Sequence, residues 1–137
     1  MLGALYGLRY VAEVMVKNGG GSIVNTASSA GVIGQASVVT YGATKHGIVG
    51  MTKSLVAEYA KDGLRVNAIA PGPIQTPMVK KFFEDNPDMK ESAESGIPQK
   101  RLGKPEDVAE LVTFLLTKAD YINGDTIRID GGFTNTK

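Results

Sequence analysis

The chain has 137 residues, a net charge of +1 and an ordinary balance of apolar (42%) and charged (21%) residues, which fits one globular domain. This charge gives no basic surface for nucleic acid or an anionic membrane, and no apolar run is long enough to span a bilayer. Without cysteine, and with His46 as the single histidine, we expect no disulfide, no thiolate chemistry and no metal site. A cytoplasmic location fits these features.

Helical spacing and glycine punctuation organise the first half of the chain. Residues 2–17 carry apolar side chains at helical spacing and end at a glycine run, which predicts an opening helix. The β-branched segment 22–26 is typical of a short buried strand. A polar, glycine-rich loop follows, and 40–61 has the apolar spacing of a long helix that Asp62-Gly63 closes.

The second half alternates short apolar segments with proline-interrupted ones. Prolines break the polar region after residue 74 into short pieces, and Pro105 suits the first turn of a later helix. The predicted elements are strands at 64–70 and 125–129, short helices near 77–84 and 88–94, and a helix at 105–117. Helices between short buried strands indicate right-handed crossovers and a parallel sheet, so the fold class is α/β. Three strands make a small sheet, and one of its edges is expected to lack a partner.

Tyr41 and Lys45 stand four residues apart near the start of the long predicted helix, so both side chains share one face. An ammonium group near a phenol favours the phenolate form. A tyrosine tuned in this way can exchange a proton with a carbonyl or alcohol oxygen. The same spacing also occurs by chance on ordinary helices, so the pair alone does not identify a catalytic site.

Polar residues gather where the predicted strands end. Ser28 and Ser29 follow the first strand, and Tyr41 begins the next crossover helix. Because ligands of open parallel sheets bind beyond the carboxyl ends of the strands, we expect Ser28, Tyr41 and Lys45 to meet at that rim. The turn Pro71-Gly72-Pro73 opens onto the same rim, although an ordinary turn would look the same.

Other titratable residues are less suited to chemistry. His46 adjoins Lys45 but is expected to point away from the face shared by Tyr41 and Lys45. The acidic residues between 84 and 94 are expected to form a solvated face rather than a metal site.

Two segments together resemble the short-chain dehydrogenase/reductase family. They read GSIVNTASSAGVIGQASVVTYGATKHGIVGMTKSLVAEYAKDGLRVNAIAPGPIQTPM and RLGKPEDVAELVTFLLTKADYINGDTIRIDGG. A serine, Tyr-x-x-x-Lys, Pro-Gly-x-Ile-x-Thr and a final Asp-Gly-Gly occur in the order typical of that family. The resemblance implies the C-terminal half of a Rossmann-like, doubly wound parallel sheet, with residues 1–137 forming a single partial domain.

The resemblance also implies a role for each matching residue. Tyr41 would be the general acid/base, and Lys45 would favour its phenolate form and hydrogen-bond the ribose of a nicotinamide cofactor. Ser28 would orient the substrate oxygen, since it precedes Tyr41 by the family's usual thirteen residues, and Ser29 would then be a loop-capping residue. The nicotinamide would lie against four residues of the turn after the second predicted strand: Pro71, Gly72, Ile74 and Thr76.

One hallmark of the resemblance is missing from this sequence. A glycine-rich strand–turn–helix unit should hold the cofactor pyrophosphate, but Gly19-Gly20-Gly21 follows a helix and precedes a strand, the reverse order. The residue that selects NAD or NADP is also missing, so either cofactor fits. The family's catalytic-site asparagine would precede Met1, and we expect the chain to begin inside a longer pattern and to be inactive or unstable alone.

The function implied is an NAD(P)-dependent oxidoreductase that moves hydride between nicotinamide and a small alcohol or ketone. An alternative is a non-catalytic remnant or assembly module that associates with a full-length relative, because the family forms homodimers and homotetramers through its two long helices, here 2–17 and 40–61. A third reading is an isomerase, epimerase or dehydratase with the same Tyr-x-x-x-Lys, against which the Pro-Gly-x-Ile-x-Thr and Asp-Gly-Gly motifs weigh.

Overall fold

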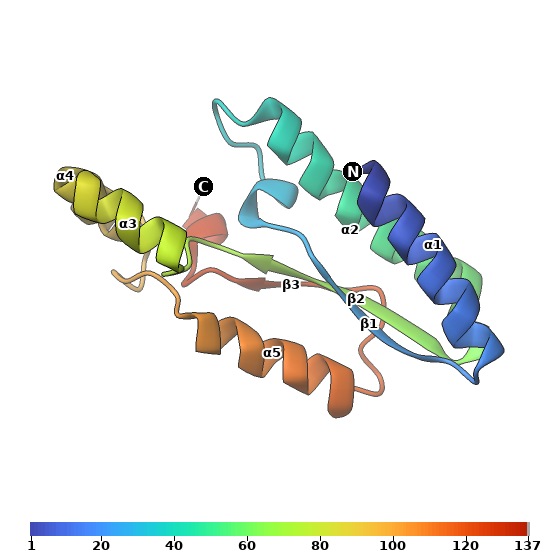
Figure 1. Cartoon of the computed structure of the whole chain (residues 1–137). Helices are drawn as coiled ribbons and strands as arrows, with labels where there is room; N and C mark the ends of the chain where they lie inside the picture. The colour runs from blue at the N-terminus through green and yellow to red at the C-terminus, as the bar shows by residue number, and fades with distance from the viewer. Residues whose placement is uncertain (137) are drawn as a thin grey trace.

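The computed structural model describes residues 1–136. It consists of a three-stranded parallel sheet with helices on both faces (Figure 1). The strands are hydrogen-bonded in the order β1-β2-β3 and span Gly21–Thr26, Leu64–Pro71 and Thr126–Ile129. The α-helices are α1 (Leu2–Lys17), α2 (Val39–Tyr59), α3 (Pro77–Asp85), α4 (Pro87–Ser95) and α5 (Pro105–Thr117). The predicted α/β class, element order and parallel pairing are confirmed.

The long helix α2 ends earlier than its apolar spacing suggests. The α-helix stops at Tyr59, and a tighter 3-10 turn (η2, Ala60–Asp62) continues to Gly63. Gly63 adopts a left-handed conformation with φ of 81°, which a glycine tolerates at low cost. The predicted helix, which ended at residue 61, therefore extended two residues into this 3-10 turn.

Two apolar layers hold the helices against the sheet. On one face, Ala12 of α1 packs with Leu64 and Val66 of β2. On the other, Leu115 of α5 packs with Ile69 of the same strand. Because successive side chains of a strand point to opposite faces, β2 supplies both layers from alternate positions and is almost wholly buried.

The end of the sheet nearest the α1–β1 turn depends on two glycines. Gly20 and Gly63 both have positive φ, of 96° and 81°. A Cβ on Gly20 would lie 2.3 Å from the Gly63 carbonyl oxygen, so the two turns meet backbone to backbone. This contact sets the start of the β1–β2 register, in which Gly21 pairs with Leu64.

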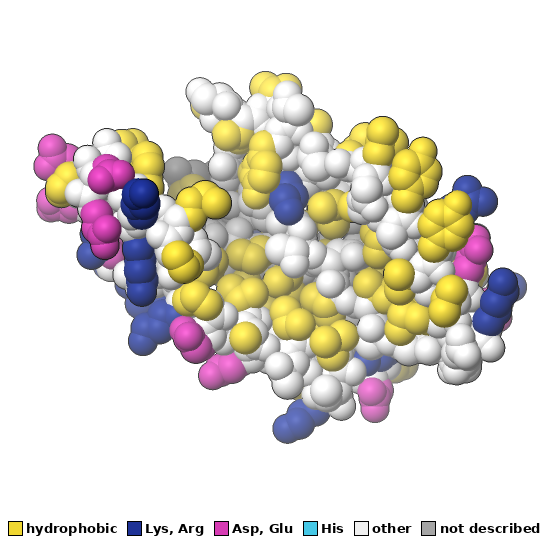
Figure 2. All heavy atoms as spheres, viewed as in Figure 1, with side chains coloured by type: hydrophobic (Ala, Val, Ile, Leu, Met, Phe, Trp, Pro, Cys, Tyr) yellow, Lys and Arg dark blue, Asp and Glu magenta, His cyan; other side chains and the backbone are white. Residues whose placement is uncertain are grey.

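Apolar side chains also lie on the surface. Figure 2 shows them over α1 and in a band between the α1–α2 layer and α5, across the β1 edge of the sheet. Those of α1 include Leu5, Tyr6, Tyr10 and Val14, each more than two-fifths exposed. Within residues 1–136, no helix combines the length and apolar character that crossing a bilayer requires.

Candidate active site

The carboxyl end of β1 runs into a short 3-10 turn, η1 (Ser29–Gly31). Ser28 has extended backbone and caps this turn, since its Oγ accepts a hydrogen bond from the Ala30 amide at 3.2 Å. Ser29 is buried, and its Oγ accepts one from the Gln35 side chain at 3.2 Å. The capping residue is therefore Ser28 rather than Ser29, contrary to expectation, and Ser28 is the less buried of the two hydroxyls.

The turn η1 lies directly against the first turns of α2. A Cβ on Gly31 would lie 2.9 Å from the carbonyl carbon and oxygen of Lys45, and one on Gly42 would lie 3.4 Å from the Ala30 carbonyl oxygen. These glycines allow the two backbones to touch. The segments that carry Ser28 and Tyr41 are thus adjacent at the carboxyl end of β1.

Tyr41 and Lys45 share one face of α2, and Lys45 links that face to the sheet. The Lys45 Nζ donates a hydrogen bond to the Thr26 carbonyl oxygen at the end of β1, at 2.9 Å. The same nitrogen lies 5.7 Å from the centroid of the Tyr41 ring, within the range of a cation–π contact. The Tyr41 side chain is 49% exposed, so its hydroxyl group can be reached from solvent.

The turn after β2 is held close to the end of β3. The Gly72 amide donates to the Ile129 carbonyl oxygen at 3.0 Å. A Cβ at Gly72 would lie 2.8 Å from the Asp130 Cβ, so a larger residue would push the two strand ends apart. Pro71 is the last residue of β2, and it places this turn at the same rim of the sheet as Ser28.

The chain then passes through a second contact before α3 begins. Ile74 forms a parallel bridge with Gly103, and the Gln75 amide donates to the Gly103 carbonyl oxygen at 2.8 Å. Thr76 caps α3, because its Oγ1 accepts a hydrogen bond from the Val79 amide at 3.3 Å. Its hydroxyl therefore has a structural partner already, which the sequence motif did not reveal.

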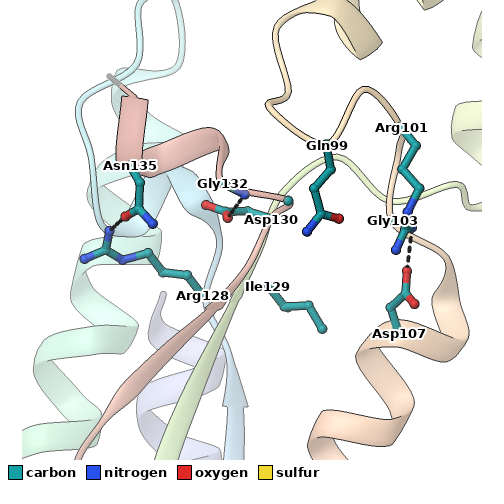
Figure 3. A pocket seen from close by; sticks show the side chains of 10 residues that line it. Gln99, Arg101, Gly103, Asp107, Arg128, Ile129, Asp130, Gly132 and Asn135 are labelled. Carbon is teal, nitrogen blue, oxygen red and sulfur yellow. Dashed lines mark hydrogen bonds and ion pairs between the residues drawn. The ribbon is translucent and has the colours of Figure 1, made fainter.

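An ion pair fixes the segment against which Ile74 packs. The Arg101 Nη1 lies 2.9 Å from Asp107 Oδ2, and the same oxygen accepts the Lys104 amide at 2.8 Å (Figure 3). The Lys104 amide and then the Arg101 side chain lower the pKa of Asp107 below its ordinary value. These contacts hold Gly103 at the start of α5, where it meets the turn after β2.

The final Asp-Gly-Gly motif forms a side-chain-capped turn. Burial alone would raise the pKa of Asp130, but hydrogen bonds from the Thr134 hydroxyl, the Thr134 amide and the Gly132 amide, with the charge of Arg128, lower it. Figure 3 shows the carboxylate turned back onto the Gly132 amide. Asp130 is thus an ionised structural anchor beside Gly72.

The titratable residues judged unsuited to chemistry from the sequence are not part of the candidate active site. His46 is exposed, and its Nδ1 lies 2.9 Å from the Gly42 carbonyl oxygen of its own helix. The acidic residues of α3 and α4 lie on the surface, and within residues 1–136 no three His, Asp or Glu side chains group as metal ligands would. His46 lines a separate pocket beside η1 together with Gly31 and Val32, away from the face of α2 that carries Tyr41 and Lys45.

The arrangement has the chemical groups for proton exchange at a bound oxygen. A phenol can give or take a proton, and a nearby ammonium stabilises its anionic form. Lys45 has three N–H donors, and the Thr26 carbonyl accepts one, which leaves two for a ligand hydroxyl. Gly31 and the Thr26 carbonyl are positioning features that the motif spacing did not single out.

Comparison with known protein families places nearly all of the chain in one group. Residues 1–134 match the family model described as enoyl-(acyl carrier protein) reductase. The levodione reductase of Leifsonia aquatica is 43% identical over 138 residues, which cover 95% of this chain and 51% of that protein. The 3-oxoacyl-[acyl-carrier-protein] reductase of Thermotoga maritima is 45% identical over 123 residues, with coverages of 89% and 49%.

Solved structures share the same backbone. The structure described as ElxO with NADP bound superposes with a TM-score of 0.93 at 34% sequence identity, over 98% of this chain and 55% of that one. The chain thus spans about half the length of the proteins it matches.

Proposed function

Because the chain belongs to the short-chain dehydrogenase/reductase family, we propose that it forms the catalytic half of an NAD(P)-dependent oxidoreductase. The reaction moves hydride between a nicotinamide cofactor and the carbonyl carbon of a small alcohol or ketone. Relatives named as levodione reductase and cyclohexanol dehydrogenase are consistent with such substrates. The observation that carries the proposal is Tyr41 beside the Lys45 ammonium, which is itself tied to the end of β1.

In this proposal three side chains act on the reacting oxygen. Tyr41 donates its hydroxyl proton to the carbonyl oxygen during reduction and takes it back during oxidation. Lys45 stabilises the phenolate left behind, and its remaining N–H donors bind the ribose hydroxyls of the cofactor. The Ser28 hydroxyl donates a hydrogen bond to the same substrate oxygen. Its Oγ can keep accepting the Ala30 amide while it does so, or give up that hydrogen bond.

The turn from Pro71 to Thr76 fits the nicotinamide end of the cofactor. Because Gly72 has no side chain, this turn lies close against Asp130. The cofactor would then bind on the other side of the turn, beyond the carboxyl end of β2. In the proposal the Ile74 backbone and the Thr76 hydroxyl bind the carboxamide, and Pro71 and Gly72 lie beside the ring. A bound cofactor would supply or accept the hydride. NAD and NADP both remain open, since the 2′-phosphate end has no counterpart among these residues.

The glycine pair Gly19-Gly20 is not placed to bind the cofactor pyrophosphate. Gly19 and Gly20 lie between α1 and β1, at the amino end of the strand and therefore at the opposite end of the sheet from Ser28. We therefore expect the 137-residue chain to bind cofactor weakly and to show no turnover by itself. Fusing the nucleotide-binding half of a close relative before Met1 is expected to restore both.

A fusion of this kind tests the proposal through Tyr41→Phe. Removing the phenol hydroxyl should lower kcat for ketone reduction by about 10²–10⁴-fold, the usual contribution of a general acid. Nicotinamide binding, followed by fluorescence, should change little. Tyr121→Phe is the matched control, because Tyr121 is fully exposed and lies far along the chain from the rim. Equal turnover in the two variants would remove Tyr41 from the mechanism.

A second function, an assembly module, is favoured by one observation. The exposed face of α1 carries Leu5, Tyr6, Tyr10 and Val14, a row of apolar side chains unusual on an open surface. In that proposal the α1–α2 face packs against a relative. Tyr10→Glu should then abolish co-elution of the chain with a tagged full-length relative, and unchanged co-elution would exclude this face.

A further inference from the structure

A polar pocket of about 310 Å³ lies between α2, η1 and β3, apart from the candidate active site. None of Ser28, Tyr41, Lys45 or the Pro71–Thr76 turn lines it. Its polar walls come from His46 and Lys53 of α2, from Thr126 and Arg128 of β3, and from Asp125.

Regular backbone spacing brings these side chains to one place. His46 and Lys53 are seven residues apart, so they lie two turns apart on one face of α2. Thr126 and Arg128 are two residues apart and share one face of β3. A helix face and a strand face thus line the pocket from two sides, with the turn η1 at one end.

The two cations of this pocket, Lys53 and Arg128, make no direct ion pair among the described residues. The Arg128 Nη1 donates instead to the neutral side-chain amide of Asn135 at 2.5 Å, and Figure 3 shows Arg128 directed away from Gln99. Asp125 is the one acidic residue of the lining, and its Oδ1 already accepts the Thr126 amide at 2.7 Å. The lining thus carries two cations and one carboxylate, with the Asp130 carboxylate within electrostatic reach of Arg128, so a small net positive charge remains.

Two further groups in the pocket keep hydrogen-bonding capacity. The Thr126 Oγ1 is shielded from solvent and has no hydrogen-bond partner among the described residues. His46 donates from Nδ1 to the Gly42 carbonyl oxygen, which can only accept, so Nε2 of the neutral ring is an acceptor for a ligand hydroxyl. A polar group left unpaired in this way is stabilised when a ligand supplies the missing partner.

We propose that this pocket binds the phosphate group of a small molecule. Arginine and lysine side chains form strong charge-assisted hydrogen bonds to phosphate oxygens, and the Thr126 hydroxyl can add another after a rotation about its Cα–Cβ bond. This site is separate from the proposed hydride transfer, because none of the side chains proposed to act on substrate or cofactor lines it.

Calorimetric titration of the purified chain with inorganic phosphate and with glycerol 2-phosphate tests the site. Sodium chloride at equal ionic strength controls for general screening. Saturable binding is expected for at least one probe, and tighter binding of the ester would identify an organic phosphate as the ligand class. Absence of saturable heat with both probes would overturn the proposal.

Variants on the two walls locate the binding. Lys53→Gln and Arg128→Gln are each expected to weaken phosphate binding at least tenfold, and both positions are exposed, so the fold should persist. Arg9→Gln is the matched control, since Arg9 is an exposed arginine on α1 outside the pocket. Binding by both wall variants equal to that of the control would overturn the proposal. In NMR spectra, the amide chemical-shift changes on phosphate addition should be largest around Thr126. Changes confined to other parts of the chain would also overturn the proposal.

Discussion

Gly31→Ala tests the contact that brings the serine turn against α2. The added methyl group would lie 2.9 Å from two backbone atoms of Lys45, where ordinary contacts begin at 3.4 Å. The η1 and α2 backbones would have to move apart by about half an ångström. Backbone atoms cannot give way as the end of a flexible side chain can, so this movement is costly. Overpacking of this kind costs about 1–3 kcal/mol. With an m-value of about 2 kcal/mol/M, the urea midpoint should fall by about 0.5–1.5 M.

The matched control is Gly34→Ala, in the same loop. A Cβ at Gly34 meets nothing within 4 Å, so this substitution should leave the midpoint unchanged or raise it slightly. Far-ultraviolet circular dichroism during urea titration measures both variants against the natural chain. Equal midpoints for Gly31→Ala and Gly34→Ala would refute the claim that a backbone contact at Gly31 sets the approach of α2.

Two other substitutions probe buried polar anchors. Asn67→Ala removes the amide that bonds the Ile122 carbonyl at 2.8 Å and the Asp125 amide at 3.1 Å, and leaving these groups unpaired should lower the free energy of unfolding by about 2–4 kcal/mol in urea titrations. A stability loss under 1 kcal/mol would contradict this. Asp130→Asn should destabilise the chain at neutral pH. Because the folded-state pKa of Asp130 is lowered, its contribution is present above about pH 4 and is lost below it, so the urea midpoints of the two chains should converge in acid. A constant difference down to pH 2 would argue against the carboxylate.

Local sequence signals predicted most of the fold. Pro105 and the two acids after it marked the start of α5, whose predicted bounds are those observed. The end of α2 was missed because apolar spacing does not separate an α-helical turn from the 3-10 turn that follows Tyr59. Likewise β2 extends through Pro71, since a proline at the last position of a strand loses only one donor.

The candidate site was predictable to the level of segments, not of hydrogen bonds. The rim rule for parallel sheets placed Ser28 and Tyr41 on adjacent segments from their sequence positions alone. Which serine caps the turn depends on the backbone angles of Ser28, and no residue pattern encodes these uniquely. That Lys53 and Arg128 line one pocket depends on the position of β3 relative to α2, which only the three-dimensional structure supplies.

The parallel pairing of β1 with β2 also bears on how the chain folds. No neighbouring strands are joined by a tight hairpin, since Gly21 pairs with Leu64 and Ala68 with Thr126 across intervening helices. The sheet therefore cannot nucleate locally. During synthesis β1 and β2 can pair only after α2 and β2 have emerged, so aggregation of the strands that are still unpaired competes with productive folding.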